Sequence, residues 1–208
     1  MIILGEAFET CVFFNGSISM CALLDAIKKT GNTLEIESMR MLSSWEDDQE
    51  GIDPHLGNAD TQSIGQKIVR LRFKIGSIHQ GGLYLYKENR HMNVVHFWIS
   101  CDHIPALSND FVTEENRAIY DRITQFISVV FSNAGMVFAS LGPEIYVEYM
   151  DDPHAVMKKS SGVVRWVFAE APGSPCAYPY TERRSGSFTL FDKQRCGESS
   201  SVYPLSRS

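Results

Sequence analysis

The amino-acid sequence predicts an α+β fold, with a mostly antiparallel sheet, two main helices packed on one face and a short third helix. Residues 69–75 alternate without interruption between apolar and basic side chains, which indicates a strand with one face in a core and the other in water. Residues 18–30 and 114–133 each carry apolar side chains at helical spacing. The predicted strands follow one another with short connections, and this order favours antiparallel pairing beneath the helices.

The first elements are a strand, a helix and a second strand. Residues 7–14 are rich in aromatic and other strand-favouring types. Ser17 is a suitable N-cap for the helix over residues 18–30, and Gly31 follows as a left-handed stop. Alternation resumes at residue 34 and predicts a strand that extends to about residue 42.

A strand over residues 66–75 is followed by an aromatic hairpin. Gly81 and Gly82 indicate a turn or a bulge just before a short strand at residues 83–87, which pairs with residues 93–101. Aromatic side chains occupy both faces of this hairpin, so we expect it at the centre of the sheet.

A second helix and two more strands follow. Thr113 caps the helix over residues 114–133, whose wide apolar stripe needs a sheet to cover it. Residues 136–141 predict a strand, and residues 144–149 predict another after a Gly-Pro break.

The last part of the chain divides into a core end and a tail. An Asp-Pro pair opens a short helix over residues 152–159, and residues 163–169 predict a core strand. We therefore expect a single α+β domain over residues 1–171. Proline, glycine and serine then dominate, so residues 172–208 are predicted to be a polar, weakly structured tail with at most one short strand near residues 188–191.

Composition and charge exclude several classes of protein. The net charge is −6, and the tail carries five basic and three acidic residues, which leaves the body at −8. An acidic body disfavours non-specific binding to nucleic acid or anionic membranes and suits a cationic partner, although moderate acidity also simply keeps a protein soluble. Mean hydropathy is −0.14, and no apolar run approaches the length of a membrane span. The first residues lack the features of a secretory signal, which favours a cytoplasmic location.

Cysteine usage argues against a disulfide framework and against a zinc site built on paired cysteines. The five cysteines are scattered, and no two of them are separated by only two residues. Cys11 and Cys21 stand among apolar residues and are predicted to be buried thiols.

No motif of a nucleotide-phosphate loop, a nucleophile elbow or a metalloenzyme is found, so no cofactor is expected. The hairpin does concentrate three histidines and an aspartate. A small hydrolase or a metal-dependent enzyme with a site assembled around His96, Asp102 and His103 is therefore kept as an alternative to ordinary surface histidines.

The polar segment over residues 43–63 is long for a loop in a compact domain, and such loops are usually functional or mobile. Its carboxylates beside a tryptophan predict one of three things: a solvated loop, a site for a hard cation, or a surface that meets Lys and Arg on a partner. A second acidic group lies in residues 144–151. The residues predicted to bind a protein partner are Trp45, Glu46, Asp47, Asp48, Glu50, Asp53, Glu144, Glu148 and Asp151.

In general character, residues 1–171 resemble the immunity proteins that bacteria keep beside their own toxins: an acidic α+β body, a long acidic loop and no catalytic motif. No diagnostic motif carries the resemblance, and no functional residue is transferred through it. The resemblance implies a non-catalytic toxin inhibitor that binds a cognate toxin tightly and occludes its active site. A structural or accessory module that self-associates through the aromatic hairpin is a further alternative, and the oligomeric state is left open.

Overall fold

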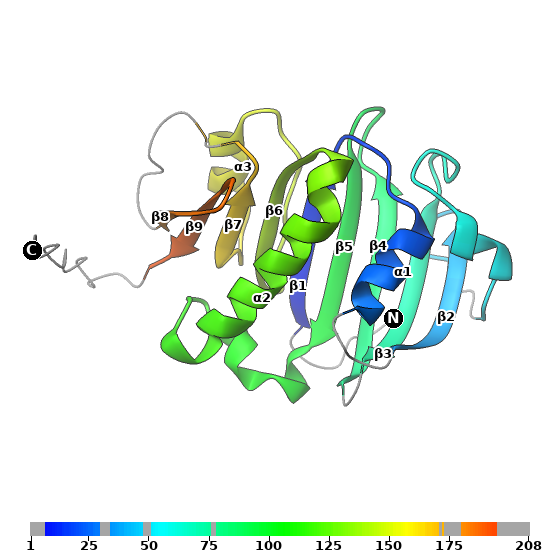
Figure 1. The fold of residues 1–208 in the computed structure, drawn as a ribbon, viewed down its shortest axis with the longest axis horizontal. Helices are drawn as coiled ribbons and strands as arrows, with labels where there is room; N and C mark the ends of the chain where they lie inside the picture. The colour runs from blue at the N-terminus through cyan, green and yellow to red at the C-terminus, as the bar shows by residue number, and fades with distance from the viewer. Residues whose placement is uncertain are drawn as a thin grey trace, which may run out of the picture.

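The described residues form one antiparallel sheet with helices on it. The computed structural model describes residues 7–29, 34–47, 51–75, 78–170, 172 and 180–194. Within them the strand order is β2-β3-β4-β5-β1-β6-β7-β9-β8, and every neighbouring pair is antiparallel (Figure 1). The α+β class and the mostly antiparallel sheet are therefore confirmed. The strands are β1 (Ala7–Phe14), β2 (Leu34–Leu42), β3 (Ile68–Ile75), β4 (Ile78–Lys87), β5 (Asn93–Ser100), β6 (Met136–Pro143), β7 (Arg165–Phe168), β8 (Tyr180–Ser185) and β9 (Phe188–Lys193).

The sheet has a helix face and a rear face. Helices α1 (Met20–Lys28) and α2 (Glu114–Phe131) lie across the helix face, in front of the strands in Figure 1. Their buried side chains, such as Ile27 and Ile127, join one core with Leu71 and the other apolar residues on that side of the strands. The short helix α3 (Pro153–Lys159) contributes Val156 and Met157 to a second core on the rear face. A sheet covered on both sides in this way accounts for the many fully buried strand residues.

The N-caps of α2 and α3 are the predicted residues, whereas the N-cap of α1 is not. Thr113 caps α2, and Asn116 returns the hydrogen bond, which completes a capping box. Asp152 caps α3 as expected. Helix α1 differs, because its cap is Ser19 instead of Ser17. The Ser17 hydroxyl instead accepts a hydrogen bond of 3.1 Å from the side chain of Thr61.

The structure corrects the predicted strand over residues 144–149. Its one bridge among the described residues joins Tyr146 to Ser161. Glu144 has a φ of 44°, a left-handed conformation that interrupts an extended chain and ends the pairing of β6 with β1 at Pro143. Glu144, Tyr146 and Glu148 therefore do not lie along one face of a regular strand, the arrangement that a strand over residues 144–149 would give.

Gly81 and Gly82 also differ from prediction, because they lie inside β4 instead of preceding it. An aromatic ring from a neighbouring strand occupies the space where a side chain of each glycine would lie. A Cβ atom on Gly81 would lie 2.8 Å from the Phe73 ring, and a Cβ atom on Gly82 would lie 2.6 Å from the Trp98 indole nitrogen. Glycine is needed here for close packing, not for a turn.

The segment predicted as a weakly structured tail contributes two strands. Strand β8 pairs with β9, and β9 pairs with β7, so residues 180–193 extend the sheet. Phe191 and Asp192 are buried there. The weak periodicity of this segment has a physical source, because a buried aspartate stands where an apolar residue would be expected. Residues 171, 173–179 and 195–208 and the predicted helix stop at Gly31 lie outside the described residues.

An arginine on β7 joins this hairpin to α2. The Arg165 side chain is fully buried, and its Nε and Nη2 atoms donate to both carboxylate oxygens of Asp192 at 2.5 and 3.1 Å. Its Nη1 atom donates to Asp121 of α2 at 2.7 Å. The guanidinium also lies over the Tyr120 ring, 5.3 Å from its centre. Paired charges and an aromatic ring thus fix the position of the Arg165 guanidinium.

A second arginine, Arg183 of β8, reinforces the same group, which we call the arginine–aspartate cluster (Arg165, Arg183, Asp121 and Asp192). Arg183 donates to Asp121 and approaches Asp192 at 3.3 Å. Burial of the Asp121 carboxyl opposes its ionisation, but hydrogen bonds from both arginines outweigh this effect and hold its pKa below the ordinary value of 3.8.

Candidate functional site

An exposed tryptophan marks the candidate site on the rear face. Trp45 lies three residues after β2, and 59% of its surface is exposed. Its indole packs edge-on against Tyr84 and Tyr86 of β4, with ring centres 5.3 and 5.1 Å apart. Burial raises the pKa of the Tyr86 phenol, which therefore stays neutral. The two tyrosines support the indole while leaving much of it available to a partner.

A histidine and a glutamate lie beside this aromatic group. His96 of β5 is opposite Tyr84 on one side and Cys11 on the other. Its Nε2 atom is 3.2 Å from the Glu9 carboxylate, and both side chains are about one fifth exposed. This distance allows an ion pair when the imidazole is protonated, although the atoms are not aligned as a hydrogen bond requires.

Of the histidine group predicted from the sequence, the structure describes the side chains of His96 and Asp102. Asp102 belongs to the short helical turn η2 (Cys101–His103) after β5, and its backbone N–H donates to Ser100. The carboxylate beside His96 comes from Glu9, which is distant in sequence and was not predicted. The side chain of His103 lies outside the described residues.

The described cysteines are two buried thiols, Cys11 and Cys101, and one exposed thiol, Cys21. Burial, reinforced by the charge of Glu9, raises the pKa of Cys11, so this thiol stays protonated beside His96. Cys21 was predicted to be buried, but it is exposed. The buried stripe of α1 consists of Met20, Leu23, Leu24 and Ile27, and Cys21 lies on its outer side.

The acidic loop has a more structural role than its composition indicates. Asp53 accepts a hydrogen bond of 3.0 Å from the His55 backbone and caps the turn η1 (Pro54–Asn58). Asp47 accepts a longer one of 3.4 Å from the Ser43 backbone. Glu46 is exposed. Asp48 and Glu50 lie outside the described residues.

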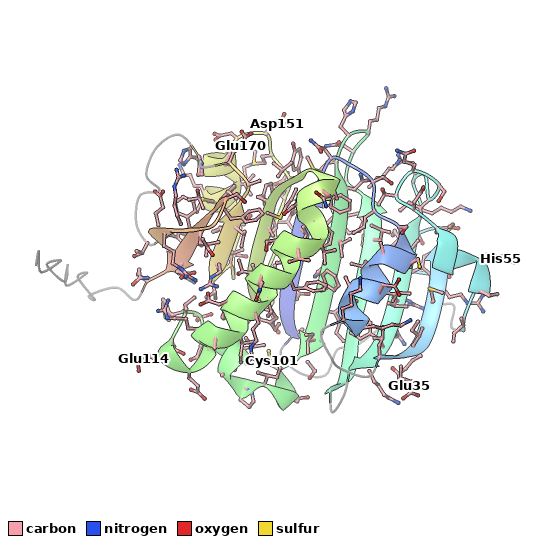
Figure 2. All side chains as sticks on the ribbon, viewed as in Figure 1. Glu35, His55, Cys101, Glu114, Asp151 and Glu170 are labelled. Atoms are coloured by element: carbon pink, nitrogen blue, oxygen red, sulfur yellow. The ribbon has the colours of Figure 1, made fainter. Side chains whose placement is uncertain are left out.

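The second acidic group is exposed but is spread along the length of β1, because the Glu144 backbone N–H donates to Ala7 at the start of that strand. Glu144, Glu148 and Asp151 are all exposed, and Asp151, labelled in Figure 2, accepts a hydrogen bond of 2.8 Å from Tyr149. The Tyr149 ring stacks on Phe13, which places this segment on the rear face of β1.

Glu88 provides a link that sequence reasoning missed. It lies two residues after Tyr86, immediately beyond the end of β4 at Lys87. Burial, together with the charge of Glu148, raises its pKa, so the two carboxylates are close enough to interact. Glu148 of the second acidic group is thus near the end of β4 that carries Tyr86. In the sequence, the position of Glu88 in the turn between two aromatic strands was the one indication that it lies near the aromatic group.

The basic strip of β3 is partly buried. Arg70 was predicted to face water, but only 5% of it is exposed, and it lies between Arg40 and Tyr84 in the sheet register. Lys74 of the same strip pairs with a glutamate of the neighbouring strand, because its Nζ atom is 2.9 Å from Glu37 of β2. This strip therefore stabilises the sheet beside the aromatic group.

Comparisons with family models, with curated proteins and with solved structures found no match to this chain. Among the described residues, no group of three or more His, Cys, Asp or Glu side chains could hold a metal ion. No helix in the described part of the chain has both the length and the apolar character of a membrane span.

Proposed function

We propose that this chain is a non-catalytic binding protein that neutralises a cognate toxin or effector by occluding its active site. The observation that carries the proposal is Trp45, a large apolar side chain that stays mostly exposed while two tyrosines hold it in place. Tryptophan and tyrosine are the residues most enriched among those that dominate binding energy at protein interfaces.

The charges around the aromatic group support a cationic partner. Glu46 adjoins Trp45 in the sequence, and Glu88 and Glu148 interact at the nearby end of the sheet. Carboxylates at the rim of an interface mainly set the rate of association and the choice of partner, whereas a buried anchor sets the affinity. In this proposal Trp45 is the anchor and the glutamates guide a basic surface toward it.

The proposal is tested by recovering the partner and measuring its activity. The tagged chain is purified from its native host, the co-purifying protein is identified, and that protein's activity is titrated with the chain. We expect complete inhibition at a fixed stoichiometric ratio. Trp45→Ala should weaken binding about 30-fold, which corresponds to a loss of about 2 kcal/mol.

The matched control is Val129→Ala on α2, because Val129 is 72% exposed on the helix that crosses the other face. It should leave binding unchanged. A second variant, Glu46→Lys, should slow association, and the effect should shrink as salt is added. A partner that keeps full activity when saturated with the chain, or a Trp45→Ala variant that inhibits like the natural chain, would contradict the proposal.

A further inference from the structure

An apolar cavity lies on the helix face, on the opposite side of the sheet from Trp45. Its volume is about 360 Å³, and it is lined by residues of α1, α2, the sheet and the turns after β5, with one side open to solvent. Its walls are aromatic and aliphatic. They include Phe8 and Phe97 from the sheet, Ile27 from α1, and Ile123 and Phe126 from α2. Pockets of this size with apolar walls are typical of small-molecule sites.

Among the described lining residues, Arg122 is the one that carries a charge, and Thr10 is the one other polar side chain. Arg122 is exposed on α2, and no ion pair or hydrogen bond of its side chain is found within the described residues. Its chain neighbour Asp121 is held by Arg165 and Arg183 instead. The cavity therefore combines an apolar interior with one cation that has no carboxylate partner in the described part of the chain.

We propose that this cavity binds a single-chain amphiphile with an anionic head, namely a fatty carboxylate. The acyl chain would displace water from the apolar walls, which is favourable in proportion to the area buried. The carboxylate would pair with the Arg122 guanidinium, whose planar donors match a carboxylate with two parallel hydrogen bonds. A cationic head would be repelled by the same arginine, and a neutral head would lose the charge-assisted bonds.

This inference is independent of the partner-binding proposal, because the two sites lie on opposite faces of the sheet. Binding of dodecanoate to the full chain is measured by titration calorimetry below the concentration at which the amphiphile forms micelles. Dodecanol and dodecyltrimethylammonium serve as the neutral and cationic comparators. We expect one dodecanoate per chain, and weaker binding of both comparators.

Two variants locate the site. Arg122→Gln should weaken dodecanoate binding about tenfold or more, the effect of losing a hydrogen-bonded charge, and should leave dodecanol binding unchanged. Ile123→Trp should fill the cavity and weaken all three compounds, with circular dichroism confirming that the variant is folded. Arg184→Gln, at an exposed position of β8, is the charge-matched control and should bind like the natural chain.

Absence of dodecanoate binding to the folded full chain would overturn the inference. Equal affinity for dodecanoate and dodecyltrimethylammonium, or an unchanged affinity in Arg122→Gln, would overturn the assignment of the head group. Unchanged binding in a folded Ile123→Trp variant would place the ligand elsewhere. None of these results affects the inhibition assay for Trp45, so failure of one proposal is distinguishable from failure of the other.

Discussion

Replacing Arg165 with methionine would test whether the arginine–aspartate cluster stabilises the C-terminal end of the sheet. Methionine keeps an unbranched side chain of similar length but removes the guanidinium. The change eliminates the paired hydrogen bonds to Asp192 at 2.5 and 3.1 Å and the bond to Asp121 at 2.7 Å. It also removes the cation over the Tyr120 ring.

The expected cost follows from what remains around Asp192. Removing one partner of a buried ion pair usually costs about 3 to 5 kcal/mol, because the other charge is left buried without compensation. Asp192 is only 3% exposed, but Arg183 and Arg117 stay within 3.3 and 3.8 Å of its carboxylate. We therefore expect the lower end, about 3 kcal/mol, which for a chain of this size lowers Tm by about 6 to 12 °C.

Urea denaturation followed by circular dichroism measures the free energy of unfolding. Arg184→Met is the control, because Arg184 is exposed on the same hairpin, and it should stay within about 0.5 kcal/mol of the natural chain. Adding Asp192→Asn to Arg165→Met should cost less than the sum of the two single changes, because the residues interact directly. A loss below about 1 kcal/mol for Arg165→Met, or strict additivity in the double variant, would refute the reasoning.

Three other predictions concern single positions. Gly82→Ala should destabilise the protein by about 1 to 3 kcal/mol in the same urea assay, because the new methyl group would lie 2.6 Å from an indole nitrogen and 2.8 Å from a backbone carbonyl; Gly57→Ala, which meets nothing within 4 Å, should be close to neutral. Asp121 has a pKa below 3.8 when folded, so its stabilising contribution is present above that pH and is lost as the pH falls through the folded pKa. In Asp121→Asn, the free energy of unfolding should therefore fall less steeply as the pH is lowered. Iodoacetamide should label Cys21 in the folded chain and Cys11 only after unfolding, as measured by peptide mass spectrometry, and early labelling of Cys11 would contradict its burial and raised pKa.

Local patterns predicted most of the secondary structure correctly. Strand β2 has the predicted bounds, and β1 does as well, because alternation and composition agree along both segments. Helix α2 begins after the predicted cap at Thr113 for the same reason. These elements depend on interactions within a few residues of each other, which a single sequence displays directly.

The errors arose where distant residues decide the structure. Gly82 lies inside a strand, where an indole from β5 covers it. No local pattern in the sequence indicates that this ring lies there. From the sequence alone, Asp192 would be assigned to the surface, because its buried partner Arg165 is far away in the sequence. The same limit applies to the candidate site. The exposed Trp45 was identified from its polar surroundings, whereas the tyrosines that support it and the Glu9–His96 contact depend on strand register.

The way β9 enters the sheet has a practical consequence for anyone who shortens this chain. Strand β9 lies between β7 and β8, and Phe191 packs against Phe168 while Asp192 neutralises Arg165. A fragment that stops at the proline-rich segment would keep Arg165 and Asp121 but lose Asp192, the buried carboxylate of the pair, and it would expose one whole edge of β7. Such a fragment should aggregate or be degraded, so fragments intended for partner or ligand binding need to extend at least through Lys193.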